Sequence, residues 1–224
     1  MKRLLLLFLA LVSLSLSPST ESAKWDRATR SVRRLVAEFP EQPSFICTTF
    51  LINPKEKVWL TAGHCVGEIL EGKDDAHPDT IIWYPLSIDD DPANVVVADL
   101  ILDLAVLRTS TIRSVAPLPL SPDEPQAGAP VAIVGFPYGH PVPYIKPVMI
   151  LNPRVENTVA PEEWPFFTAL DGKGAPGMSG SPLVNAQGQV VGIYLGWWQT
   201  AYGPIGSAVP WQELTRLAGA YFPM

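Results

Sequence analysis

Basic residues are scarce in this sequence. The chain of 224 residues has 16 Lys and Arg against 22 Asp and Glu, which gives a formal net charge of −6. Binding to the phosphates of nucleic acids needs clustered Lys and Arg, so this balance argues against a nucleic-acid partner.

Cysteine and histidine are also scarce. Cys47 and Cys65 are the two cysteines, and the three histidines show no metal-ligand spacing with them. A metal site would need further ligands, so we expect no metal and no cofactor. The acidic run Asp89–Asp91 could be imagined as a cation site. No ligand loop with a glycine and a distal Glu follows it, which favours a solvated turn.

The sequence also lacks a hydrophobic run that would span a membrane comfortably. Lys2 and Arg3 are followed by a short apolar stretch over 4–16 and then by small residues, which predicts a signal peptide over 1–23. The alternative is an uncleaved N-terminal anchor. Export predicts a secreted or periplasmic protein with no membrane anchor after cleavage, and in such a protein an even pair of cysteines predicts a disulfide.

The rest of the chain predicts an all-β fold. Its 24 prolines and 16 glycines separate short apolar runs that are typical of antiparallel strands. The runs "SPLV" and "VVGIYL" flank the polar turn "NAQGQ", which predicts a hairpin. The predicted order is an N-terminal arm over 24–35, a strand set over 36–113, a proline-rich linker over 114–130, and a second strand set with a C-terminal helix over 131–224.

The stretch "GAPGMSGSP" places Ser179 between two glycines, where the backbone turns sharply or approaches another group closely. A serine hydroxyl is a poor nucleophile unless a base activates it and a third group orients the base. "TAGHC" places His64 at the end of an apolar strand, and "DLAVL" places Asp103 inside another. A lone carboxylate there costs free energy unless it meets a partner, and a histidine ring N–H would be one.

The order His, Asp, Ser eliminates two rival enzyme classes. A nucleophile-elbow esterase needs a glycine where Ser181 stands and a histidine after the nucleophile. A subtilisin-type order needs an acid in a strand before the histidine, and none is convincing. Other interpretations stay open. His64 could be a packed residue at a strand end, and Asp99 could be the acid although "LAVL" does not follow it. His140 could line the cleft, His77 could be a solvated loop residue, and the glycines could form an ordinary turn.

Together, "TAGHC", "DLAVL" and "GMSGSP" resemble the three signatures of the chymotrypsin/trypsin-like serine proteases over roughly residues 31–222. "VGFP" and "VVGI" are similar to bacterial members of that family. The resemblance implies two antiparallel six-stranded β-barrels with the active site in the cleft between them. Family members commonly have a disulfide where Cys47 and Cys65 stand.

The resemblance also implies a role for each matching residue. His64 would be the general base and acid, Asp103 would hold the imidazole tautomer, and Ser179 would be the nucleophile. The backbone N–H groups of Gly177 and Ser179 would form the oxyanion hole. The expected protein is an exported, monomeric serine endopeptidase that acts on proteins or peptides through an acyl-enzyme. The alternative is a non-catalytic, protease-like binding protein.

Three positions depart from the family pattern. Met178 stands where vertebrate members have the Asp that pairs with a freed N-terminus, so a new end at Leu35 would find no carboxylate there, and Asp171 is the more distant alternative. We therefore expect the oxyanion hole to form without N-terminal insertion. After "VVGI" the family often has a serine that helps hold the catalytic Asp, whereas this sequence continues with Tyr194, Leu195 and Gly196. Lys173 lies near the position where trypsins have an Asp, which argues against cleavage after Lys or Arg.

Overall fold

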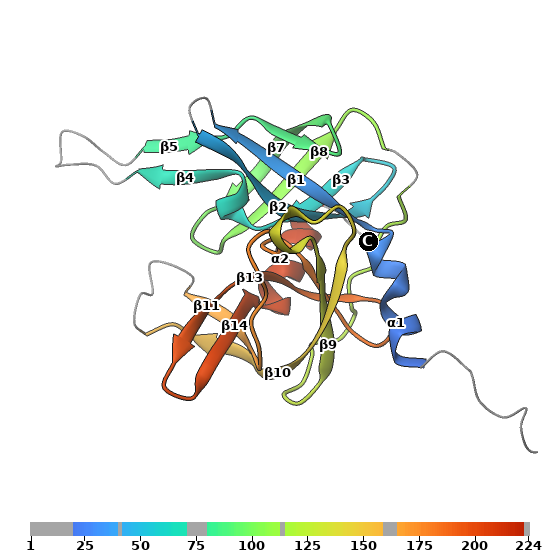
Figure 1. Cartoon of the computed structure of the whole chain (residues 1–224), viewed down its shortest axis with the longest axis vertical. Coiled ribbons are helices and arrows are strands. Elements are labelled where there is room, and N and C mark those ends of the chain that lie inside the picture. The colour runs from blue at the N-terminus through green and yellow to red at the C-terminus, as the bar shows by residue number, and fades with distance from the viewer. Residues whose placement is uncertain (1–19, 40–41, 71–79, 113–114, 159–164, 222–224) are drawn as a thin grey trace, which may run out of the picture.

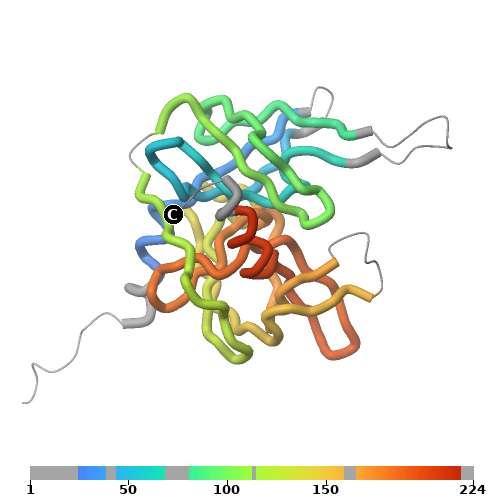
Figure 2. Tube along the Cα trace, turned by 180° about the vertical axis from the view of Figure 1, so that it is seen from behind, coloured from blue at the N-terminus to red at the C-terminus, as the bar shows by residue number. Residues whose placement is uncertain are grey.

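The computed structural model describes residues 20–39, 42–70, 80–112, 115–158 and 165–221. Within these residues the strands form two closed, six-stranded antiparallel barrels, one above the other in Figure 1 and seen from behind in Figure 2. A closed barrel leaves no unpaired strand edge. The all-β, two-barrel architecture predicted from the sequence is therefore confirmed.

Barrel 1 has the strand order β1-β2-β3-β8-β7-β6. Its strands are β1 (Val32–Phe39), β2 (Gln42–Asn53), β3 (Val58–Thr61), β6 (Leu86–Ile88), β7 (Asp91–Asp99) and β8 (Leu104–Thr109). β1 pairs with both β2 and β6, which closes the barrel. All of β3 and most of β8 are buried, as expected for strands that bring Val, Leu and Trp into a core. A separate hairpin of β4 (Gly67–Leu70) and β5 (Thr80–Trp83) extends beside this barrel (Figure 1).

Barrel 2 has the strand order β10-β11-β14-β13-β12-β9. Its strands are β9 (Pro130–Gly135), β10 (Tyr144–Glu156), β11 (Phe166–Leu170), β12 (Pro182–Val184), β13 (Val190–Thr200) and β14 (Gly203–Val209). β12 and β13 are the predicted hairpin, and the Asn185 side chain accepts hydrogen bonds from the N–H groups of Gln187 and Gln189 in its turn. The predicted C-terminal helix is α2 (Trp211–Tyr221), and it buries Leu214 completely.

The N-terminal part of the chain differs from the predicted boundaries. Most of the predicted signal peptide, residues 1–19, lies outside the described residues. Helix α1 (Thr20–Thr29) begins before the predicted arm, and β1 begins at Val32, inside the segment predicted as that arm. The reason is that Leu35 is apolar and fully buried in barrel 1. No helix in the described part of the chain is long and apolar enough to cross a membrane.

The segment predicted as a linker contacts both barrels. The Leu118 N–H donates a hydrogen bond of 2.9 Å to the Leu51 carbonyl of barrel 1. On the other side, Ser121 donates to the Val190 carbonyl and Val190 donates to the Pro119 carbonyl, both at 2.8 Å, in barrel 2. These bonds hold the two barrels in one arrangement, which matters because the candidate site is built from both.

Candidate active site

His64 and Asp103 form a hydrogen-bonded pair at one end of barrel 1. His64 lies in η1 (Gly63–Cys65), directly after β3, and Asp103 directly precedes β8, the strand that pairs with β3. The Asp103 carboxylate accepts from the His64 ring, with Nδ1–Oδ2 and Nδ1–Oδ1 distances of 2.8 and 3.0 Å. Its Oδ1 also accepts the His64 backbone N–H at 2.7 Å. Three contacts therefore fix the imidazole relative to the carboxylate.

The two members of this pair differ in exposure. The Asp103 side chain is 2% exposed, whereas the His64 side chain is 38% exposed. Burial alone would lower the pKa of His64, but the negative charge of Asp103 and its hydrogen bond to the ring raise it, and the pKa stays above its ordinary value of 6.5. The result is a partly exposed histidine whose Nδ1 is hydrogen-bonded to a buried acid.

The backbone around the pair is tightly packed. Asp103 has a φ of +56°, the left-handed region that Asp and Asn tolerate better than most residues. A Cβ on Gly63 would lie 3.0 Å from the Leu104 nitrogen and 3.1 Å from Asp103 backbone atoms, so glycine permits this close approach. Asp99, the competing acid, instead accepts the N–H groups of Ile101 and Leu102 in a turn.

A disulfide joins Cys47 of β2 to Cys65, the residue after His64, with a Cα–Cα distance of 6.2 Å. It connects the segment that carries His64 to a central strand of barrel 1. Potential metal-ligand atoms of Cys47, His64 and Cys65 lie within 4.8 Å of one another. Because both sulfurs are in the disulfide, neither is a free thiolate that could bind a metal.

Ser179 lies in barrel 2, on a turn with two left-handed glycines. Gly177 has a φ of +89° and Gly180 a φ of +81°. Met178 between Gly177 and Ser179 is buried in the core of barrel 2. The Ser179 hydroxyl donates a hydrogen bond of 2.9 Å to the Leu195 carbonyl, and within the described residues it makes none to His64. The structure thus pairs His64 with Asp103 but leaves the serine hydroxyl on a backbone carbonyl.

The predicted oxyanion-hole donors are both unengaged. Neither the Gly177 nor the Ser179 backbone N–H donates a hydrogen bond within the part of the chain that the structure describes. The carbonyl of Pro176 accepts the Tyr138 N–H at 2.6 Å. Since N–H and C=O point in opposite directions across a trans peptide, this bond turns the Gly177 N–H away from Tyr138.

Thr48 of β2 connects the two barrels at this turn, and the sequence reasoning missed it. Its N–H donates to the Ser179 carbonyl and its hydroxyl to the Gly177 carbonyl, both at 2.8 Å. The hydroxyl also accepts the Phe136 N–H at 3.1 Å. The run "SFICTTFLI" contained a signal for Thr48, because a polar side chain in an apolar strand needs a partner. The same argument selected Asp103.

Tyr194 of β13 holds the other side of the turn. Its hydroxyl accepts the Gly174 N–H at 2.7 Å, and its carbonyl accepts the Gly180 N–H at 2.8 Å. Burial raises the pKa of Tyr194 to about 12, against the opposing effect of the Gly174 hydrogen bond, so the hydroxyl stays neutral. The turn is therefore anchored at both ends.

The remaining candidates take other places. Ser181 is fully buried, and its hydroxyl has no partner among the described groups. His140 lies in an exposed loop, where its Nδ1 is 3.2 Å from the Val142 nitrogen, and His77 lies outside the described residues. Lys173 places its ammonium 4.2 Å from the ring centre of Trp197.

The sequence matches the trypsin-like peptidase domain over residues 47–193, more than half of the chain. The search of curated proteins gave no match. The span that matches contains His64, Asp103 and Ser179.

Solved structures of bacterial proteases have the same fold. The HtrA-type protease AlgW with a tripeptide is 22% identical (TM-score 0.65), and the alignment covers 92% of this chain and 64% of AlgW. The serine endoprotease from Yersinia pestis is 20% identical (TM-score 0.64), with 92% and 67% covered. The active form of the Rv3671c protease from M. tuberculosis is 21% identical (TM-score 0.65), with 90% and 83% covered.

At these identities the structural likeness concerns the fold alone, and this chain spans less than two thirds of the length of AlgW. The sequence match is the stronger finding, because it covers parts of both barrels and all three candidate residues. This chain belongs to the trypsin-like peptidase domain family.

Proposed function

We propose that this protein is an exported serine endopeptidase that hydrolyses peptide bonds through His64, Asp103 and Ser179. The observation that carries the proposal is the pairing of the buried Asp103 carboxylate with the His64 ring across distances of 2.8 and 3.0 Å. A buried carboxylate on a partly exposed histidine is the arrangement that a general base needs. The glycine-flanked Ser179 supplies the nucleophile.

The first step is proton transfer and attack. Asp103 accepts the Nδ1–H of His64, which leaves the Nε2 lone pair free to accept a proton. The Ser179 hydroxyl must leave the Leu195 carbonyl by a side-chain rotation and donate to Nε2. Its oxygen then attacks the substrate carbonyl, and the proton moves to His64. Apo structures commonly show such catalytic hydrogen bonds unformed.

The second step is stabilisation and collapse of the tetrahedral intermediate. The free N–H groups of Gly177 and Ser179 would bind its oxyanion, and each such donor contributes on the order of 3 kcal/mol. His64 then gives its proton to the leaving amine, which breaks the peptide bond and leaves an acyl group on Ser179. Water activated by His64 hydrolyses this ester and restores the serine.

The proposal includes activity without N-terminal insertion. Leu35, the end that a cut after Arg34 would free, pairs with Cys47 and Ile88 inside barrel 1. Moving it would expose a buried strand. The position where a freed N-terminus would need a carboxylate is occupied by the buried, apolar Met178. Burying an unpaired ammonium beside it would cost free energy. Removal of the predicted signal peptide alone would then give a competent, monomeric enzyme in a secreted or periplasmic location.

Labelling with a fluorophosphonate tests the proposal. The chain from Lys24, carrying an N-terminal tag, should be labelled, and Ser179→Ala should abolish labelling while its circular dichroism stays native. Ser181→Ala is the matched control, since Ser181 is buried and two residues away, and it should keep labelling. Labelling that survives Ser179→Ala and disappears in Ser181→Ala would overturn the assignment. Labelling that requires a cut near Arg34 would overturn activation by signal removal alone.

The alternative is a protease-like protein that binds peptides without cutting them. The bond from the Ser179 hydroxyl to the Leu195 carbonyl favours it, because it keeps the serine from His64. That alternative predicts no labelling at any pH and no release of new peptide ends from a peptide library, although peptides bind.

A further inference from the structure

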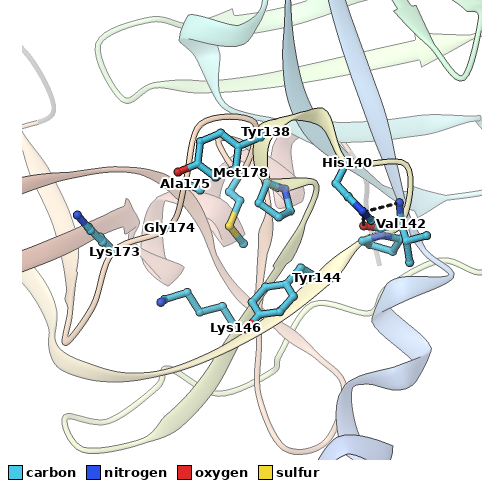
Figure 3. A pocket seen from close by; sticks show the side chains of 11 residues that line it. Tyr138, His140, Val142, Tyr144, Lys146, Lys173, Gly174, Ala175 and Met178 are labelled. Atoms are coloured by element: carbon cyan, nitrogen blue, oxygen red, sulfur yellow. Dashed lines mark hydrogen bonds between the residues drawn. The ribbon is translucent and has the colours of Figure 1, made fainter.

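A pocket of about 640 Å³ lies against the turn that carries Ser179 (Figure 3). Eleven residues line it, and neither Ser179 nor His64 is among them. Its lining comes from two segments, 137–146 before and at the start of β10, and 173–178 on the turn itself. None of His64, Asp103 and Ser179 lines the pocket, and its volume suits a small ligand.

Apolar groups dominate the lining. Met178 forms a buried part of it, and Val142 and Tyr144 are 61% and 57% exposed around it. Figure 3 shows the Met178 side chain pointing into the space above Tyr144 and Lys146. Exposed apolar side chains gathered around a concave surface indicate a binding site rather than a solvated loop.

The pocket also contains an unpaired cation. Lys146 lines the pocket and is partly buried (Figure 3), and its ammonium makes no ion pair with any described carboxylate. The Lys173 ammonium likewise has no described carboxylate partner and lies over the Trp197 ring. One carboxylate oxygen of Asp171 accepts a hydrogen bond from the Met149 N–H. In a protein with a net charge of −6, a lysine left without an acid in an apolar pocket favours an anionic ligand.

We propose that this pocket binds a small apolar molecule that carries a carboxylate. The apolar part would lie against Met178 and Tyr144, and the carboxylate would bind the Lys146 ammonium. A free organic acid and the C-terminus of a peptide share this chemistry. An amine would be disfavoured, since Lys146 would repel it.

Binding there would affect the Ser179 turn directly. Met178 precedes Ser179, and its N–H donates to the Ala175 carbonyl at 3.0 Å. Tyr138 also lines the pocket, and its backbone N–H donates a hydrogen bond to the Pro176 carbonyl. Its backbone is strained, with a φ of +53°. A ligand that contacts Tyr138 and Met178 thus contacts both sides of the predicted oxyanion hole. This coupling, unlike binding itself, rests on the proposed function.

The test follows the methionine methyl signals by NMR in protein carrying Ser179→Ala, which cannot turn over a peptide. Phenylbutyrate, phenylbutanol and phenylbutylamine differ only in their head group. We expect phenylbutyrate to move the Met178 methyl signal and to bind about tenfold more tightly than the alcohol, as one charge-assisted contact predicts. The signal of Met149, which does not line the pocket, should not move.

Matched variants locate the carboxylate. Lys146→Gln should weaken phenylbutyrate binding about tenfold and leave phenylbutanol binding unchanged. Arg108→Gln, which removes an exposed cation from β8 of barrel 1, should change neither. Val142→Asp, at an exposed position on the rim, should weaken the acid selectively by repulsion. Native circular dichroism of each variant confirms folding.

The source of the ligand is distinguished by a tripeptide ending in Phe, tested with a free and an amidated C-terminus. Tighter binding of the free form identifies a peptide C-terminus, and binding of phenylbutyrate alone identifies a free acid. A Met178 signal that no compound moves, or equal affinity for acid and amine, overturns the site. A moved signal without any change in the labelling rate of the unsubstituted protein overturns only the coupling.

Discussion

The two barrels hold their parts of the candidate site in different ways. In barrel 1, the bonds between Asp103 and His64 form between the ends of paired strands, and a disulfide fixes the next residue. In barrel 2, the turn of Ser179 is held partly from the opposite barrel, through Thr48. The His64–Asp103 pair therefore depends on the folding of one barrel, whereas the geometry of Ser179, the proposed nucleophile, depends on how the two barrels pack.

The largest expected effect breaks the barrel 1 half. Asp103→Asn should reduce the fluorophosphonate labelling rate about 10⁴-fold, because the amide cannot hold the histidine tautomer. The fold should survive, since Asn also tolerates the φ of +56° at this position. Labelling kinetics with thermal unfolding as a control measure both. A loss below tenfold would show that Asp103 is not the orienting acid.

The second test breaks the contact between barrels. A Cβ on Gly180 would overlap the Thr48 carbonyl and the Thr61 hydroxyl, so Gly180→Ala should lower the free energy of unfolding by about 3 kcal/mol or more and suppress labelling. Gly128→Ala is the matched control, because Gly128 has a φ of +80° but nothing within 4 Å of its added Cβ. It should cost only about 1 kcal/mol of backbone strain. Equal losses would mean that strain, not packing, selects Gly180.

The third test concerns the disulfide in barrel 1. It closes a sequence separation of 18 residues, and replacing both Cys47 and Cys65 by Ala should lower the free energy of unfolding by about 3 kcal/mol. Urea unfolding measures the change. The midpoint of the pH–rate curve should stay the same, because the bonds from Asp103 to His64 remain. A shifted midpoint would mean that the disulfide also positions the base.

A smaller effect is expected at Thr48. Thr48→Val keeps the shape but removes the bridging hydroxyl, which should cost about 1 to 2 kcal/mol and slow labelling about tenfold. Thr49→Val removes a hydroxyl that bonds only to Leu60 within barrel 1, so it should cost similar stability without slowing labelling. Thr48→Ser should restore the rate. Equal slowing by both valine variants would assign Thr48 a merely structural role.

The smallest effect is a shift on the pH axis. Neutral His64 is the proposed base, so the labelling rate should rise with pH through a midpoint above 6.5, the direction in which Asp103 moves the pKa of His64. Because this pKa is raised in the folded state, the stabilisation from the protonated pair is present below the unfolded pKa and is lost as pH rises through the folded one. The midpoint of the labelling rate against pH tests the direction of the pKa shift. The midpoint of unfolding measured across pH tests the direction of the change in stability. A midpoint below 6.5 would contradict the pairing.

The sequence by itself determined the fold class and indicated the three candidate residues. Apolar runs separated by proline and glycine turns specify strands locally. The carboxylate in "DLAVL" stands out because an apolar strand is costly for an unpartnered charge, and the serine in "GMSGSP" stands out because glycines flank it. It also indicated the disulfide, because only one pairing of two cysteines exists.

Tertiary structure alone decided the rest. The inclusion of Leu35 in barrel 1, the bridge from Thr48 to Gly177 and the rotamer that sends the Ser179 hydroxyl to Leu195 each depend on segments far apart in the chain. The pocket between segments 137–146 and 173–178 has the same origin. Local sequence patterns report propensity and burial, but a hydrogen bond between two barrels depends on where their packing places a donor and an acceptor.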